Sequence, residues 1–142
     1  SRDGSMVYHL DMAPTLCELT GAEIPSRYDG RSLARHLQGT PDWDRDYLVW
    51  THGLYTLQRG VRTRDHLLLK TWDDHGYPFA PTQLYDMNTD PYMSTDLSPQ
   101  APEVVDRLNT HYQTWLDEQS AGAWAIPDPL MGELERRRSL GT

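Results

Sequence analysis

The sequence has a single cysteine, Cys17, and a single phenylalanine among 142 residues. One cysteine excludes an internal disulfide and a zinc–thiolate cluster. No stretch reaches the roughly 20 apolar residues that a membrane-spanning helix needs, so we expect no membrane partner. Basic residues are also scarce. Thirteen Lys and Arg against 21 Asp and Glu give a net charge of −8, which argues against a nucleic-acid partner.

Tryptophan and tyrosine are plentiful instead, with five Trp and eight Tyr. These amphipathic aromatics suit half-buried surfaces and sugar-facing rims, although packing is their commoner use. The length is that of one domain able to bury a core. The basic run Arg136 to Arg138 is interpreted as a solvated last helical turn, where the helix dipole favours positive charge. No leader peptide is visible, and residues 1–5 fit either a cloning remnant or a loop cut mid-chain.

The first 40 residues carry strand and helix signals in turn. Met6 to Leu10 predicts a short strand, and Asp11 predicts the N-cap of a helix that ends at Gly21. After a turn at Asp29-Gly30, Ser32 predicts the cap of a second short helix.

Beyond residue 46 the period of the apolar residues becomes that of extended chain. Strands are predicted over residues 47–51, 58–63, 66–72 and 82–87. A long helix over residues 102–119 has one apolar face, which should cover one side of the sheet. A last helix is expected over residues 130–138. We therefore predict an α+β fold, with a four-stranded antiparallel sheet covered by the long C-terminal helix and preceded by a strand–helix segment.

Three short blocks, in this order, resemble the C-terminal part of type I sulfatases. The first is Leu10 to Leu16, the second is Asp29 to Leu33, and the third is Leu84 to Met87 with Asp90-Pro91 after it. The hairpin segment Arg62 to His66 also looks like the family's hairpin before the third block. The chain then departs from the pattern, because the family usually has Glu at position 93 and Asn at position 96.

The resemblance implies three parts. Residues 1–40 look like a remnant of the family's large α/β domain, residues 41–119 like its C-terminal subdomain, and residues 120–142 like a C-terminal extension. The missing N-terminal catalytic domain is the partner that this division implies. Without that domain, residues 6–39 should expose apolar surface, so self-association through this segment is expected.

The family's chemistry lies in the large domain. There a Cys or Ser in a Cys/Ser-x-Pro/Ala-x-Arg motif becomes formylglycine, and a calcium-like divalent metal polarises the sulfate. Cys17 is followed by Glu18 and Leu19 and does not match, so the resemblance assigns no catalytic, metal or cofactor residue to this chain. It implies a sulfuric ester hydrolase whose C-terminal portion completes the substrate pocket and is inactive alone. The alternative is a stand-alone glycan- or protein-binding module.

His52 and Arg62 are two candidates for contact with substrate at the rim of that pocket. His52 follows a predicted strand, and an imidazole at a sheet end can donate to sulfate or sugar hydroxyls, although local hydrogen bonding is commoner. Arg62, with Arg59 and Arg64 nearby, has the guanidinium geometry that matches sulfate oxygens. Cross-strand pairing with carboxylates is the alternative for these arginines.

Trp72 and His75 are the other two rim candidates. Trp72, together with Trp124, is a candidate for stacking on a sugar ring. His75 follows Asp73 and Asp74, which suggests a metal site, but neighbours in one loop seldom all point at one ion. A polar loop is therefore the favoured interpretation of that run.

Overall fold

The computed structural model describes residues 4–40, 42–121, 125 and 127–141. The chain divides into two compact units, Ser1–Asp46 and Tyr47–Thr142. Within the described residues, no helix has the length and apolarity needed to cross a lipid bilayer.

The first unit contains a 3-10 turn, η1 (His9–Asp11), and two helices, α1 (Met12–Thr20) and α2 (Ala34–Leu37). The predicted strand over Met6 to Leu10 is wrong. The Asp11 carboxylate accepts a hydrogen bond from the Tyr8 amide, and the Asp11 amide donates to the Tyr8 carbonyl, so the chain curls before it can extend. The predicted end of α1 at Gly21 is confirmed, with a φ of 74° that glycine adopts without strain.

Asp11 is the centre of the first unit and is buried. Its Oδ1 accepts from the Arg31 amide at 2.9 Å and from Arg45 Nη2 at 2.7 Å. Gly30 must be a glycine, because a Cβ there would lie 2.0 Å from the Leu10 carbonyl oxygen. The first two sulfatase-like blocks therefore meet in one polar cluster.

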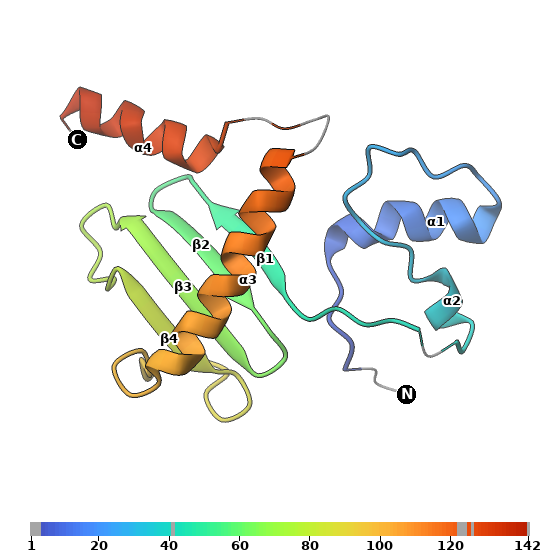
Figure 1. The fold of residues 1–142 in the computed structure, drawn as a ribbon, viewed down its shortest axis with the longest axis horizontal. Helices are drawn as coiled ribbons and strands as arrows, with labels where there is room; N and C mark the ends of the chain where they lie inside the picture. The colour runs from blue at the N-terminus through green and yellow to red at the C-terminus, as the bar shows by residue number, and fades with distance from the viewer. Residues whose placement is uncertain (1–3, 41, 122–124, 126, 142) are drawn as a thin grey trace. The chain divides into compact units, whose positions relative to one another are not determined.

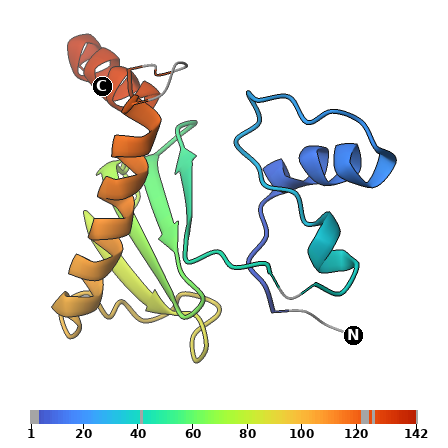
Figure 2. The same cartoon turned by 45° about the vertical axis from the view of Figure 1, so that its right-hand side comes forward.

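The second unit contains an antiparallel sheet in the strand order β1-β2-β3-β4 (Figures 1 and 2). The strands are β1 (Leu48–His52), β2 (Leu57–Arg62), β3 (His66–Asp73) and β4 (Thr82–Asp86). All four predicted strands are confirmed, each end within one residue of its predicted position.

One row of apolar side chains runs across all four strands. Val49 pairs with Val61, Val61 with Leu68 and Leu68 with Leu84, so the four side chains share one face. Helix α3 (Pro102–Ala121) lies across this face and covers the row with Leu108, which is fully buried (Figure 2). The predicted covering helix is confirmed. Burial of this row is the main apolar contribution to the stability of the unit.

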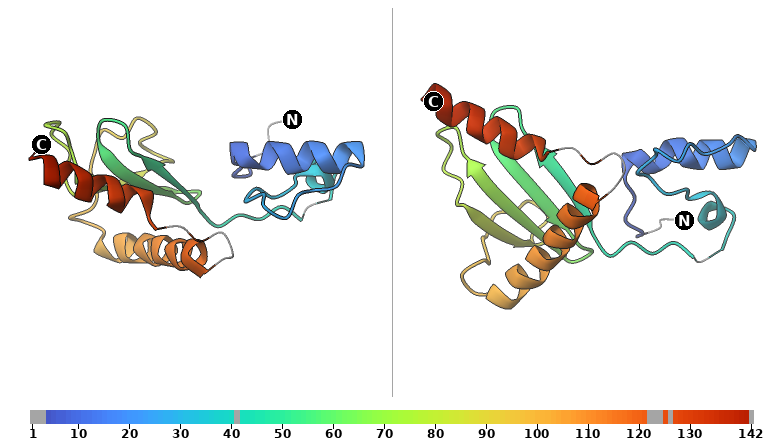
Figure 3. Two further views of the ribbon diagram at one scale, coloured as in Figure 1. Left: turned by 90° about the horizontal axis from the view of Figure 1, so that it is seen from above. Right: turned by 45° about the horizontal axis from the view of Figure 1, so that its top comes forward.

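The last helix, α4 (Pro129–Leu140), is also confirmed. It runs past the end of the sheet where the β1–β2 and β3–β4 loops lie (Figure 3). Leu130 and Leu134 pack there against Leu57 at the start of β2. Asp128 caps the helix by accepting from the Leu130 amide at 3.0 Å.

Candidate functional site

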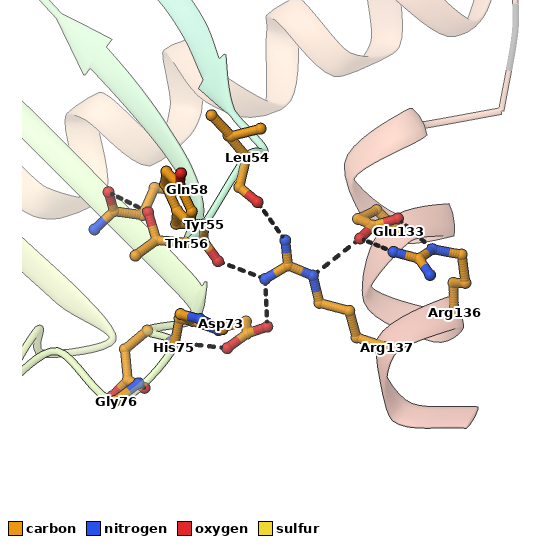
Figure 4. A network of polar contacts seen from close by, with 11 residues as sticks. Leu54, Tyr55, Thr56, Gln58, Asp73, His75, Gly76, Glu133, Arg136 and Arg137 are labelled. Atoms are coloured by element: carbon orange, nitrogen blue, oxygen red, sulfur yellow. Dashed lines mark hydrogen bonds and ion pairs between the residues drawn. The ribbon is translucent and has the colours of Figure 1, made fainter. Parts of the chain in front are cut away.

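The candidate site is the end of the sheet next to α4. In an antiparallel meander the first and third connections lie at the same end, so the β1–β2 and β3–β4 loops are neighbours. We call residues 52–56 and 73–79 the rim. Figure 4 shows both segments of the rim facing the C-terminal half of α4.

The rim carries exposed apolar and aromatic side chains. Leu54, Tyr55, Tyr77 and Phe79 are between 38% and 72% exposed. The Tyr55 ring lies 6.4 Å from the His75 ring, and the Tyr77 and Phe79 rings are 5.8 Å apart. Amphipathic rings gathered at loop tips suit contact with a sugar or a protein surface.

Arg137 of α4 holds the rim segments together. Its Nη1 donates to the Tyr55 carbonyl at 2.5 Å and to Asp73 Oδ2 at 2.8 Å, and its Nη2 donates to the Leu54 carbonyl at 2.9 Å (Figure 4). Nε donates to Glu133 Oε1 at 2.9 Å. The interpretation of residues 136–138 as a solvated turn is therefore wrong for Arg137, whose side chain is only 12% exposed.

Asp73 of the rim and Glu133 of α4 both pair with arginines of α4. Hydrogen bonds from Arg137 and then from the His75 amide lower the pKa of the Asp73 carboxyl. Hydrogen bonds from Arg136 and Arg137 lower the pKa of Glu133 to about 2. The rim is thus held by ionised groups at neutral pH.

His52 and His75 both lie at this end of the sheet. His52 is exposed at the last position of β1. His75 is exposed in the β3–β4 loop, with a φ of 50°, and its amide donates to Asp73 Oδ1 at 3.0 Å. The structure therefore brings these two candidates to the same end of the sheet.

Arg62 lies at the opposite end of the sheet, whereas Trp72 lies at the rim end of β3 but on the face that the helices cover. Arg62 pairs in register with Leu48, at the opposite end of the sheet, and its Nη1 donates to the His66 carbonyl at 3.3 Å. Burial lowers the pKa of Arg62. Trp72 lies on the face that α3 covers, with its ring 6.3 Å from that of Tyr112. Arg62 therefore does not join the histidines, whereas Trp72 lies at their end of the sheet, packed against Leu57 and α4.

Arg59, Arg64 and Trp124, the other residues considered for substrate contact, are not among the residues that define the rim. Arg59 is buried and pairs with Asp128, the N-cap of α4, rather than with a carboxylate on a neighbouring strand. Arg64 is exposed in the β2–β3 turn. Trp124 lies outside the described residues.

The described residues do not fit the family's metal site or its nucleophile. Among them, no group of three or more His, Cys, Asp or Glu side chains is placed to hold a metal ion. Cys17 is half-buried in α1, and the residues after it do not match the formylglycine motif.

Sequence reasoning expected a Trp- and Tyr-rich rim, but it missed that Tyr55, Tyr77 and Phe79 are its aromatic side chains, and it missed Arg137. The sequence contained a signal for the rim, because Tyr55, Tyr77 and Phe79 stand in segments predicted to be loops. Aromatic residues in exposed loops indicate a contact surface. The signal for Arg137 was its spacing. It follows Leu130 and Leu134 by seven and three residues, which places it on their face of the helix.

The four-stranded meander with its covering helix is the fold of the C-terminal part of sulfatases, which confirms the predicted fold and resemblance. The chain matches the solved structure of BT1596, a 2-O GAG sulfatase, over 84% of its own length and 27% of that chain, with a TM-score of 0.66 and 24% identity. It matches BT4656, solved with its substrate D-glucosamine-2-N,6-O-disulfate, over 83% of its length and 25% of that chain, with a TM-score of 0.67 and 22% identity.

A third matching structure is that of a "putative sulfatase" from Bacteroides thetaiotaomicron VPI-5482. It is 26% identical, with a TM-score of 0.59, over 78% of this chain and 24% of that one. The chain thus spans about a quarter of the length of these proteins. No family model and no curated protein matches the sequence.

Proposed function

We propose that this chain is the C-terminal part of a sulfatase, a sulfuric ester hydrolase, and that its rim completes the substrate pocket of the parent enzyme. The proposal rests on the share of each chain that the structural matches cover. Most of this chain matches about a quarter of each sulfatase, so the fold is one that sulfatases contain as a part.

In this proposal the chain is inactive alone, because formylglycine and the divalent metal belong to the large N-terminal domain. Residues 1–40 are a remnant of that domain. One observation supports an absent neighbour: Met12, Leu16 and Leu19 recur at helical spacing on α1 and are 47% to 64% exposed. An apolar helix stripe of this kind is normally covered.

The proposed role of the rim is to hold the sulfated substrate. The imidazoles of His52 and His75 can donate to sulfate or sugar hydroxyls, and the rings of Tyr55 and Tyr77 can stack on a sugar. Arg62 and Trp72 stay predictions. Arg62 lies at the opposite end of the sheet, and Trp72 lies at the rim end with its ring packed against both apolar clusters.

The test uses the whole reading frame that contains this chain. We expect its product to hydrolyse a sulfate ester, with D-glucosamine-2-N,6-O-disulfate as the first substrate assayed, and to lose activity when residues 47–142 are deleted. His52→Ala and His75→Ala should raise KM more than they lower kcat. Hydrolysis by the 142-residue chain alone would contradict the proposal, as would a reading frame without a Cys/Ser-x-Pro/Ala-x-Arg motif.

A second function, a binding module without catalysis, is favoured by the exposed aromatic side chains of the rim. It predicts saturable quenching of tryptophan fluorescence when heparin oligosaccharides are added to the chain alone. Tyr55→Ala should remove that response, whereas Tyr92→Ala, in an exposed loop outside the rim, should not. An unsaturable or salt-independent response would argue against this function.

A further inference from the structure

We infer that Arg137 is a positioning residue, which fixes the two loops of the rim from α4 without being part of the ligand-binding surface. The inference rests on the proposed function for the meaning of the rim. Its structural part, the attachment of both loops to one side chain, stands on contacts within the second unit.

The guanidinium group of Arg137 contacts both segments of the rim. One planar fork donates to the carbonyls of Leu54 and Tyr55 in the β1–β2 loop and to the carboxylate of Asp73 at the end of β3. These acceptors belong to separate segments of chain. A lysine has no fork and would hold at most part of this arrangement.

Asp73 connects Arg137 to His75, because its two carboxylate oxygens accept from different partners. While Oδ2 of Asp73 accepts from Arg137, its Oδ1 accepts from the His75 amide. His75 and Gly76 have φ values of 50° and 81°, and the left-handed region is uncommon for a residue with a side chain. Such a conformation persists where the surroundings determine it. The Arg137–Asp73 pair is therefore part of what holds His75 in its loop conformation beside Tyr55.

Helix α4, which carries Arg137, is itself anchored on the sheet. Leu130 and Leu134 anchor α4 on Leu57, and Glu133 orients the guanidinium of Arg137 from one turn earlier in the same helix. Arg137 therefore acts from an element that is itself fixed to the sheet. Its neighbour Arg136 donates to the same Glu133, but its side chain is 60% exposed. Arg136 is thus a matched control.

The experiment compares Arg137→Ala, Arg137→Lys and Arg136→Ala in the full chain by NMR. We expect Arg137→Ala to speed hydrogen exchange of the His75 amide about tenfold and to shift the carbonyl ¹³C resonances of Leu54 and Tyr55. Exchange at the Val61 and Leu68 amides should stay unchanged. Arg137→Lys should fall between, and Arg136→Ala should match the unaltered chain.

Two results overturn the inference. One is unchanged exchange at His75 in Arg137→Ala, and the other is equal acceleration at Val61 and Leu68, which would mean a general loss of stability. If Arg137→Ala does not fold, Asp73→Asn tests the same link with a smaller change, and faster exchange at His75 is again the expected result.

A binding measurement distinguishes failure of this inference from failure of the proposed function. Heparin oligosaccharide is titrated into each variant, and Arg137→Ala should raise Kd about fivefold relative to Arg136→Ala, since its loops lose their fixed geometry. If the unaltered chain binds neither this probe nor D-glucosamine-2-N,6-O-disulfate, the binding-module function fails, and the role of the rim in the parent enzyme is decided by the KM of the His52→Ala and His75→Ala variants of the whole reading frame. The exchange data still decide whether Arg137 positions the loops.

Discussion

Arg59 and Asp128 form a two-point ion pair between the middle of the sheet and the start of the last helix. Nη1 of Arg59 lies 2.9 Å from Oδ2 of Asp128, and Nη2 lies 2.8 Å from Oδ1. The side chain of Arg59 is 1% exposed, and two further N–H groups donate to the hydroxyls of Tyr112 and Thr51. This buried cation therefore depends on a carboxylate 69 residues away in the sequence.

Asp128→Ala should destabilise the second unit by about 2–4 kcal/mol, because it leaves the buried guanidinium without a counter-charge and removes the cap of α4. Asp128→Asn keeps an oxygen that can cap the helix and should cost less. The measurement is urea unfolding followed by the indole resonance of Trp115, whose ring lies 5.1 Å from the Arg59 guanidinium. Glu135→Gln, exposed on α4, is the control, and an Asp128→Ala midpoint equal to that control would refute the dependence.

Asp96→Asn should cost less stability at pH 7 than Asp96→Ala, losing only the part that the ionised carboxylate adds. Burial raises the pKa of Asp96, but hydrogen bonds from the Leu84 and Ser98 amides to its Oδ1 outweigh burial, so the pKa is lowered. The Oδ1 of an asparagine can accept the same two bonds. Asp96→Ala, in contrast, should cost about 1–2 kcal/mol because both amides lose their acceptor.

The same carboxyl predicts a pH dependence. A carboxyl whose pKa is lowered on folding adds stability above its unfolded value, near 3.8, and that stability is lost as the pH falls through the folded pKa. The urea midpoint should therefore drop below about pH 4, and Asp96→Asn should flatten part of that drop. Asp106→Asn, exposed on α3, should leave the profile unchanged. A profile for Asp96→Asn identical to that of the unaltered chain would contradict this account.

Gly30→Ala should disrupt the first unit, at a cost of about 2–3 kcal/mol or more, because the new Cβ collides with backbone that cannot rotate away. The indole N–H of Trp43 donates to the Met6 carbonyl at 3.0 Å, so its resonance reports on this unit. Gly132 lies within α4, and a Cβ added there would meet no atom within 4 Å. Gly132→Ala should therefore stabilise the second unit by up to about 1 kcal/mol. A normal Trp43 resonance in Gly30→Ala would show that the collision is relieved.

The chain alone should self-associate through the apolar stripe of α1. Light scattering should give a mass above that of the 16.4 kDa monomer, and Leu16→Gln should lower it by weakening a surface that is otherwise apolar. Glu18→Gln, on the same helix, is the control. A monomer with residues 6–39 ordered would count against this expectation.

The sheet could be predicted because each strand has its own signal. Alternating residues such as Val49 and Val61 mark the buried face, and the turn between β2 and β3 was visible as a polar break. The segment before Asp11 was mispredicted because apolar residues favour a strand locally, whereas a carboxylate three residues ahead accepts from the Tyr8 amide. Such a local polar contact overrides propensity, and only the arrangement of the chain reveals it.

The candidate site was predicted less well, since its two histidines were expected but the groups that hold them were not. A basic residue near a helix C-terminus is normally solvated, and Arg136 fits this rule while Arg137 does not. What separates them is one position on the helix, and thus the face that each presents to the sheet. The acceptors of Arg137 in the β1–β2 loop are backbone carbonyls, which residue identity does not reveal.

The strand order β1-β2-β3-β4 also has a consequence for how the second unit is made. Every strand pairs with its neighbour in the chain, so the sheet needs only short loop closures and should form early. The contact between Arg59 and Asp128 is the opposite case, a long-range closure. During synthesis the sheet emerges before α4, and we expect the guanidinium of Arg59 to stay hydrated until Asp128 arrives. Docking of α4 should then follow the formation of the sheet, expelling that water and setting the rim loops.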